Sequence, residues 1–188
     1  MARPFVVGIG GTTRAESGTE LAVRKILANA EELGAETKLY AGPELEKLPF
    51  YAPERPERTE LAEQLVADLR RADGVVIGSS SYHGTIAGLI KNALDYTQDM
   101  MKDERPYFAG RPVGLVATGA GWQGVVATLE HMRTMVHSLR GWPTPLGGAI
   151  NTLEKAFDDK GEPLDEKVGF QLRTIAEEVL QFVERFTD

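Results

Sequence analysis

The sequence predicts a doubly wound α/β fold, in which helices cover both faces of a parallel sheet. Five apolar runs alternate with five helical patterns along the chain. Two of the runs, 75–77 and 113–117, are almost continuously apolar, which is typical of parallel strands buried on both faces. A stretch rich in glycine and hydroxyl residues, 8–19, separates the first run from the first helical pattern. A ligand-binding edge of the sheet is therefore expected at this stretch.

The expected strands are the apolar runs in chain order. The first contains Phe5-Val6-Val7 and leads directly into the glycine-rich stretch. The third and fourth contain the two buried runs, and the second and fifth complete the alternation with helices. The predicted strands are Pro4–Ile9, Glu36–Tyr40, Gly74–Gly78, Pro112–Thr118 and Pro145–Ile150.

The expected helices follow the strands, and the last one has the clearest pattern. Its apolar residues recur every three or four positions from Val168 to Phe186, so this stripe is expected to face the core. The first helix opens with Ser17 and Glu20 in the spacing of a capping box. The predicted helices are Ser17–Leu33, Thr59–Ala72, Ile86–Asp99, Gly124–Leu139 and Asp165–Phe186.

These repeats favour a three-layer, flavodoxin-like arrangement with a five-stranded parallel sheet in the order 2-1-3-4-5. In such a sheet the ligand lies at the carboxyl ends of strands one, three and four, so the loops after strands three and four should also be ligand loops. The length of 188 residues suits one domain, which is predicted to span 1–188.

Composition narrows the function classes. The net charge of −7 argues against nucleic acid as a partner, and no basic run suggests a membrane surface. The chain has no cysteine, which excludes thiol chemistry. The first strand begins too early for a signal peptide and no apolar stretch is long enough to span a membrane, so a cytoplasmic location is expected. His131 and His137 are six apart, which does not suit a helical metal site, and no metal is expected.

The stretch after the first strand has the character of a phosphate site. Helix N-termini present backbone N–H groups to anions, and Arg14 adds a fixed positive charge. Thr13 stands where a dinucleotide fingerprint needs its third glycine, and no lysine precedes Lys25, as a P-loop would require. A phosphomonoester therefore suits this loop better than a pyrophosphate or a nucleoside triphosphate. The Ser17–Glu20 box has a purely structural reading as a helix cap, and the two readings are compatible.

The loops after strands three and four suit a flat ring. Residues 78–85 combine hydroxyls with Tyr82 and Gly84, and residues 118–124 contain three glycines and Trp122. Glycine permits a close approach of backbone to a ligand. A hydrolase elbow centred on Ser80 is disfavoured because Tyr82 is too bulky for its second glycine position. Trp122 is either a wall of the pocket or a buried anchor.

Together these residues resemble the NADPH-dependent FMN reductase family, a flavodoxin-like group that includes quinone, chromate and azo-dye reductases. The resemblance covers roughly residues 5–150 and rests on three motifs together with the glycine-rich loop 118–124. The three motifs are Gly11-Thr12-Thr13-Arg14 followed by Ser17, the 80–85 loop, and Gly88-x-x-Lys91-Asn92-x-x-Asp95. The sequence departs from the family at Ser80, where a proline is common.

The resemblance implies an FMN site and a homodimer or homotetramer. It assigns the FMN phosphate to Thr12, Arg14, Ser17 and Thr19. It places Ser80, Ser81, Tyr82, His83, Gly84 and Thr85 along one border of the flavin ring. It places Thr118, Gly119, Gly121 and Trp122 along the other edge.

The function implied is hydride transfer from NADPH or NADH to FMN, followed by reoxidation by a small-molecule acceptor. Candidate acceptors are a quinone, a metal ion, an azo compound and free flavin for a partner monooxygenase. The cofactor carries this chemistry, so no catalytic acid or base is expected. The alternatives are a non-enzymatic electron carrier of the flavodoxin type, which usually lacks an arginine in this loop, and an interaction protein with an FMN-type pocket. The sequence assigns no site to an adenine-linked phosphate, which leaves NADH and NADPH open.

Overall fold

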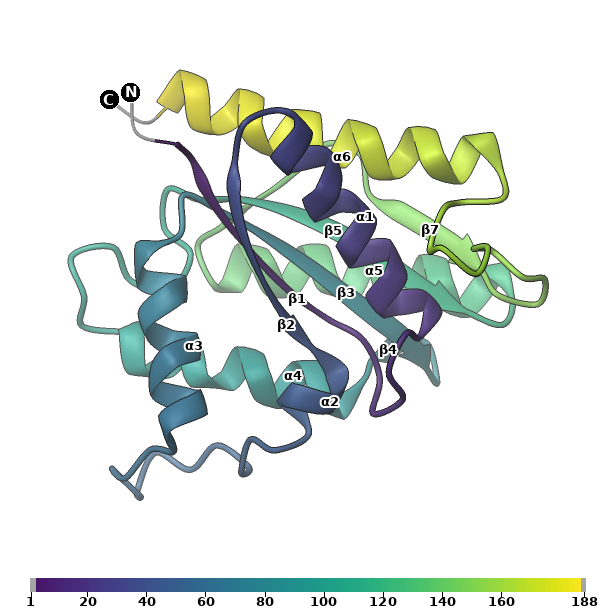
Figure 1. Cartoon of the computed structure of the whole chain (residues 1–188). Coiled ribbons are helices and arrows are strands. Elements are labelled where there is room, and N and C mark those ends of the chain that lie inside the picture. Colours follow the sequence, from purple (N-terminus) through teal and green to yellow (C-terminus); the bar gives the residue numbers. More distant parts are fainter. Residues whose placement is uncertain (1–2, 187–188) are drawn as a thin grey trace.

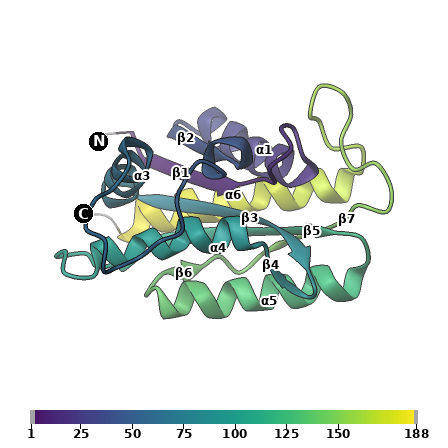
Figure 2. The ribbon, with the colours of Figure 1, turned by 90° about the horizontal axis from the view of Figure 1, so that it is seen from below.

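A mostly parallel sheet lies between two layers of helices in the computed structural model, which describes residues 3–186 (Figures 1 and 2). The ends of the predicted domain, 1–2 and 187–188, lie outside the described residues. The strands are β1 (Phe5–Gly10), β2 (Glu36–Ala41), β3 (Gly74–Tyr82), β4 (Thr85–Ile86), β5 (Pro112–Gly119), β6 (Trp142–Pro143) and β7 (Gly148–Asn151). The helices are α1 (Gly18–Glu32), α2 (Gly42–Leu45), α3 (Glu60–Arg71), α4 (Gly88–Asp95), the 3₁₀ helix η1 (Tyr96–Met100), α5 (Trp122–Ser138) and α6 (Glu166–Phe186).

The predicted strand order is confirmed. β1 pairs with β2 and β3, β3 pairs with β5, and β5 pairs with β6 and β7, all in parallel. The predicted starts of two helices, Ser17 and Thr59, are the N-cap residues of α1 and α3, where each hydroxyl accepts a backbone N–H. The short helix α2, with a proline in its first turn, was not predicted.

The sheet has seven strands rather than five, in part because a two-residue strand, β6, precedes the fifth predicted strand, Pro145–Ile150, of which residues 148–150 lie in β7. β6 pairs with the start of β5 and β7 pairs with its end. Between them, Arg133 donates to the carbonyl oxygens of Thr144 and Pro145 at 2.9 Å each, and Leu146 donates its N–H to Glu178 at 2.9 Å. Side chains thus take the backbone groups that would otherwise continue the ladder.

The seventh strand comes from the stretch after strand three, which was predicted to be a loop. β3 continues to Tyr82 and then turns back into β4, so that Tyr82 pairs with Thr85. The turn residues His83 and Gly84 have φ angles of 53° and 76°, the left-handed conformations of a type I′ hairpin turn. The predicted helix Ile86–Asp99 is wrong at its start, because Ile86 belongs to β4, and after Asp95 the chain tightens into η1.

Two hydrophobic cores lie on the two faces of the sheet. Val75 and Ile77 of β3 enter the core beneath α3, α4 and α5, while Val76 enters the core beneath α1 and α6. This alternation follows from the two-residue period of a strand. α6 lies close to the sheet, since a Cβ atom added at Gly114 would lie 2.5 Å from Cγ2 of Ile175.

Glycines in the sheet allow α1 to lie equally close. A Cβ atom added at Gly8 would lie 2.6 Å from Cδ1 of Leu27, and one added at Gly10 would lie 2.6 Å from Cγ2 of Val23. At Gly78 the corresponding distance to Cγ2 of Val23 is 2.3 Å. Real side chains do not approach so closely, so α1 can occupy this position only where β1 and β3 carry glycine.

A buried arginine holds the end of α3 against the segment before β5. Arg111 is 1% exposed. Its guanidinium donates to the carbonyl oxygens of Ala72 at 2.9 Å, Tyr107 at 3.0 Å and Arg70 at 2.8 Å. Burial, with a smaller contribution from the nearby Arg105, lowers the pKa of Arg111 to about 10. The side chain therefore satisfies carbonyl groups that the end of α3 leaves open.

Replacing Arg111 with alanine should destabilise the fold strongly. Arg111→Ala removes three hydrogen bonds from a charged donor and leaves a cavity, so the free energy of unfolding should fall by at least about 3 kcal/mol in urea denaturation. Arg105→Ala is the matched control because Arg105 is exposed, and its effect should be below about 0.5 kcal/mol. Similar losses in the two variants would show that the buried network is not what stabilises this region.

Candidate functional site

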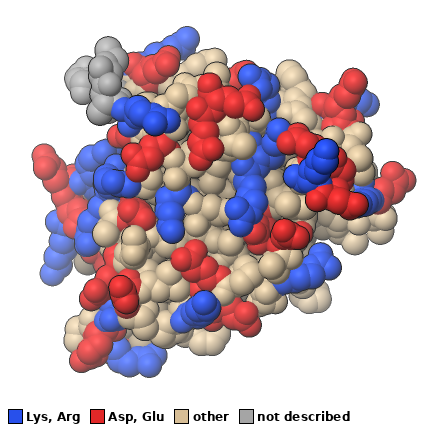
Figure 3. Space-filling view, viewed as in Figure 1, with Lys and Arg blue, Asp and Glu red and all other residues tan. Residues whose placement is uncertain are grey.

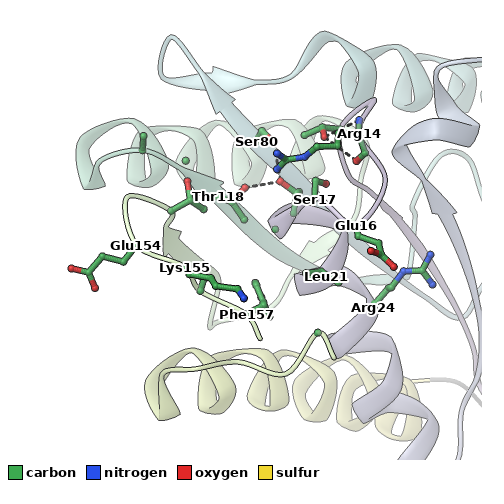
Figure 4. Close-up of a pocket in the computed structure, with 18 of the residues that line it drawn as sticks. Arg14, Glu16, Ser17, Leu21, Arg24, Ser80, Thr118, Glu154, Lys155 and Phe157 are labelled. Carbon is green, nitrogen blue, oxygen red and sulfur yellow. Dashed lines mark hydrogen bonds between the residues drawn. The ribbon is translucent and has the colours of Figure 1, made fainter. Parts of the chain in front are cut away.

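An open cleft of about 1280 Å³ lies at the carboxyl ends of β1, β3 and β5 (Figure 4). Nine of the predicted site residues line it, namely Thr12, Arg14, Ser17, Thr19, Ser80, Ser81, Tyr82, Thr118 and Gly119. The other five, His83, Gly84, Thr85, Gly121 and Trp122, are not among the lining residues. The predicted edge of the sheet is thus where the cleft lies.

The start of α1 is built by a capping arrangement around Ser17 and Glu20. The Ser17 hydroxyl accepts the N–H of Glu20 at 3.3 Å, and the Glu20 carboxylate accepts the N–H of Glu16 at 3.2 Å. Glu20 is 2% exposed and receives two further hydrogen bonds from Arg24, at 2.9 and 2.7 Å. The structural reading of this box is therefore correct, and it holds the loop before α1 in place.

The same helix start leaves donors open toward the cleft. Among the described residues, the N–H groups of Ser17, Gly18 and Thr19 have no hydrogen-bond acceptor. Arg14 is exposed and makes no ion pair within residues 3–186. The hydroxyl of Thr12 is used within the loop, where it contacts the backbone N–H and carbonyl of Arg14 at 3.3 and 3.2 Å. Open N–H groups and an arginine are the donors with which proteins commonly bind anions.

A cluster of three hydroxyls forms the floor of the cleft. Oγ1 of Thr19 lies 2.8 Å from Oγ of Ser80 and 2.6 Å from Oγ1 of Thr118. The cluster joins the first turn of α1 to the ends of β3 and β5. Three hydroxyls carry three protons, and the two hydrogen bonds use two of them. One O–H group thus has no acceptor within the cluster.

The β3–β4 hairpin forms one rim. Tyr82 lines the cleft and is 56% exposed, whereas His83 and Gly84 make the turn beyond it. Oγ1 of Thr128, on α5, lies 2.9 Å from Oγ of Ser81 and 3.2 Å from the carbonyl oxygen of Thr85, and so ties the hairpin to that helix. The hairpin places the Tyr82 ring beside the cleft and His83 outside it.

The β5–α5 segment forms the adjoining rim. Gly119 lines the cleft, and the N–H of Gly121, a residue with φ of 103°, donates to Oδ1 of Asn151 at 3.1 Å. Trp122 is the first residue of α5 and is 58% exposed. A buried anchor is therefore excluded for Trp122, and its side chain stands on the surface beside the cleft.

One wall of the cleft was not predicted. It is the β7–α6 loop, which contributes the lining residues Thr152, Glu154, Lys155, Ala156, Phe157, Asp158, Asp159, Lys160 and Gly161. Phe157 is 4% exposed and bridges to Pro163, and Lys25 of α1 contacts Glu162 at 2.7 Å. The position of this loop after the last strand, at the same edge of the sheet, was the available signal.

Asp158 organises this loop. Its carboxylate accepts the backbone N–H groups of Lys160 at 2.8 Å and Glu162 at 2.9 Å. These two hydrogen bonds, with Glu162 the larger contributor, hold the pKa of Asp158 below its usual range. Lys155 pairs with Asp159 at 2.6 Å, which raises the pKa of Lys155. The loop therefore has a defined turn, in which the carboxylates of Asp158 and Asp159 have partners.

The family follows from comparison with known proteins. The family model described as NADPH-dependent FMN reductase matches residues 4–155. The chain belongs to this family. The match includes all the predicted site residues and ends within the β7–α6 loop, and it confirms the resemblance found in the sequence.

A curated relative of the family is the FMN-dependent NADPH-azoreductase of Staphylococcus aureus. It is 32% identical over 116 residues, which are 60% of this chain and 57% of the azoreductase. The chain thus spans less than two thirds of the length of this relative.

Two solved structures illustrate the shared fold. FerB, a flavoenzyme NAD(P)H:(acceptor) oxidoreductase from Paracoccus denitrificans, has a TM-score of 0.76 over 98% of this chain and 99% of FerB, at 18% identity. A flavodoxin, WrbA-like protein from Agrobacterium tumefaciens has a TM-score of 0.66 over 99% of this chain and 100% of its own, at 14% identity. These likenesses confirm the flavodoxin-like fold.

The surface of this family member carries no segregated charge on the face drawn in Figure 3. Acidic and basic side chains are interspersed there, over the α1 and β2 side of the molecule. In the part of the chain that the structure describes, no helix is long and apolar enough to cross a membrane.

The hydroxyl cluster should contribute to stability as well as to the cleft. Thr19→Val keeps the shape of the side chain but removes both hydrogen bonds, which leaves the buried Thr118 hydroxyl without its partner. The free energy of unfolding without ligand should fall by about 1–2 kcal/mol in urea denaturation. Thr13→Val, at an exposed loop position, should change it by less than about 0.5 kcal/mol. If Thr19→Val left the free energy of unfolding unchanged, the hydroxyl cluster would make no contribution to stability.

Proposed function

We propose that this protein is an FMN-dependent NAD(P)H oxidoreductase that passes electrons from NADPH or NADH through FMN to a small-molecule acceptor. The observation that carries the proposal is the anion site at the start of α1, where open N–H groups and the unpaired Arg14 face a cleft in a member of this family. A phosphate monoester is the ligand that this donor set suits.

The residues of the cleft fit both ends of FMN. The N–H groups of Ser17, Gly18 and Thr19 with Arg14 would hold the phosphate, and the spare O–H of the floor cluster would contact the polar chain that leads to the ring. Tyr82 and Gly119 offer an aromatic side chain and a glycine backbone on the two rims. Ser80 extends the polar floor, so the absence of the family's proline there adds a donor.

The protein supplies binding and orientation in this proposal. Bound FMN would supply the redox chemistry, by accepting a hydride from the nicotinamide and releasing electrons to the acceptor. The open cleft leaves room for a second flat ring against the first, and no side chain of the cleft has to act as a general acid or base. Trp122 and His83, beside the cleft, would border the space that the dinucleotide enters.

We propose the same acceptor classes as the sequence indicated, namely a quinone, a metal ion, an azo compound or free flavin for a partner monooxygenase. The azoreductase activity of the staphylococcal relative supports azo compounds. We also propose a single domain over 1–188, a cytoplasmic location and a homodimer or homotetramer. The exposed Trp122, Val126 and Tyr82, with exposed fractions of 58, 48 and 56%, support assembly because they are large apolar side chains on one side of the molecule.

The proposed activity is tested by anaerobic reduction. FMN-loaded protein mixed with excess NADPH or NADH should lose its flavin absorbance rapidly, and a quinone, an azo dye or free FMN added afterwards should restore it. A chain that binds FMN but is not bleached by either dinucleotide would be an electron carrier. A chain that gains no thermal stability from FMN would not be a flavoprotein, since a ligand that binds only the folded state must raise its stability.

Arg14 should distinguish FMN from riboflavin. Arg14→Ala removes a charge-assisted contact to the phosphate, so the binding free energy of FMN should weaken by about 1.5–3 kcal/mol in a fluorescence titration. Riboflavin, which lacks the phosphate, should bind almost as before. Arg185→Ala, at an exposed position near the end of α6, is the control and should leave both affinities unchanged. Equal weakening of the two ligands by Arg14→Ala would overturn the phosphate assignment.

A further inference from the structure

The cleft extends past the start of α1 into a second half, on the side of the sheet covered by α1 and α6. We call this half the loop-side subsite. Its walls are Leu21 and Arg24 of α1 and Ala156, Phe157, Lys160 and Gly161 of the β7–α6 loop. Gly161 lies against α1, since a Cβ atom added there would be 3.3 Å from Cδ2 of Leu21. In Figure 4, Leu21 lies between Phe157 of the loop and Arg24 of α1.

FMN in the proposed position leaves this subsite free. The elements that suit the flavin ring, the β3–β4 hairpin and the β5–α5 segment, lie on the opposite side of the sheet edge. There a Cβ atom added at Gly84 would be 3.9 Å from the Cβ of Ala127 on α5. A ligand pocket commonly holds about 300–1,000 Å³, whereas this cleft holds about 1280 Å³. The cleft therefore has room for FMN and for part of a second ligand.

The charges of the loop-side subsite favour an anion. Three acidic groups of the β7–α6 loop are occupied, because Asp159 pairs with Lys155, Glu162 pairs with Lys25, and Asp158 accepts two backbone N–H groups. Glu16 also lines the cleft and lies beside Arg24, across from the loop, in Figure 4. Glu154 points away from the cleft in Figure 4.

Two cations of the loop can serve this anion. Within the described chain, Lys160 makes no ion pair. Lys155 extends toward the cleft in Figure 4, and its ammonium has three donors, so it can contact an anion while it keeps its pair with Asp159. Leu21 and Ala156 add apolar groups to the lining of the subsite. Cations together with apolar groups suit a nucleotide, in which a flat base adjoins a phosphate.

We propose that the loop-side subsite binds the adenosine end of NADPH, with Lys160 and Lys155 at its 2′-phosphate and the base over Leu21 and Ala156. The inference rests on the proposed function, in which a nicotinamide dinucleotide reduces FMN in the other half of the same cleft. The 2′-phosphate is the group that NADPH has and NADH lacks. Lys160 is then the residue that makes the protein prefer NADPH.

The test uses FMN-loaded protein and the probe adenosine 2′,5′-bisphosphate, with adenosine 5′-phosphate for comparison. By calorimetry the unmodified protein should bind the bisphosphate more tightly, and Lys160→Ala should weaken that binding about tenfold while leaving adenosine 5′-phosphate within about twofold. In steady-state assays the same variant should raise the KM for NADPH about tenfold, with kcat and the KM for NADH unchanged. Lys102→Ala, at an exposed position outside the cleft, should change none of these values.

Three results would overturn the proposal. The first is that the unmodified protein binds the bisphosphate no more tightly than adenosine 5′-phosphate. The second is that Lys160→Ala raises the KM for NADPH and the KM for NADH equally. The third is that Lys160→Ala weakens FMN binding, which would place Lys160 at the flavin phosphate. The failure of the proposed function is separate, because it would appear as unmodified protein that is not bleached by either dinucleotide. Probe binding that depends on Lys160 would still support a nucleotide at the subsite.

Discussion

The close packing of α1 on the sheet is the constraint on which the site depends. Gly8, Gly10 and Gly78 provide the space that Val23 and Leu27 occupy. With the helix seated this near, its first turn lies level with the carboxyl ends of β1 and β3, and Thr19 can reach Ser80 and Thr118 across the strand ends. A larger residue at any of these glycines would lift the helix and open the hydroxyl cluster, so the geometry of the helix start is set within the core.

The capping arrangement around Ser17 divides the polar groups of this region into two sets. Glu20, although acidic and buried, faces back toward the loop and is neutralised by Arg24. The open N–H groups and Arg14 face the cleft. An anion can therefore approach the helix start without meeting the carboxylate that stabilises it. One short segment thus combines a helix cap with the donors that the proposed phosphate site requires.

The sequence predicted the sheet order, the start of α1 and most of the lining of the cleft, because periodicity, capping residues and glycine-rich loops are local signals. It did not predict the β3–β4 hairpin. The hairpin requires a positive φ at His83, which is not a glycine, and it is held by the pairing of Tyr82 with Thr85. Nor did the sequence predict the wall 152–161. That segment has no ligand motif, and it is held at the cleft by the burial of Phe157 and the contact between Glu162 and Lys25. Both are tertiary effects.

The gap between β6 and β7 also affects whether another chain can pair with this edge of the sheet. An edge strand that runs unbroken exposes a row of unpaired N–H and C=O groups, to which another chain can add and start aggregation. Here that edge is broken between β6 and β7, and side chains of Arg133 and Glu178 occupy the backbone groups in the gap. At the opposite edge, β2 carries the charged Glu36 and Lys38. Both margins of the sheet are thereby protected, which lets the cleft remain wide open at one end of the strands without making the fold prone to strand exchange.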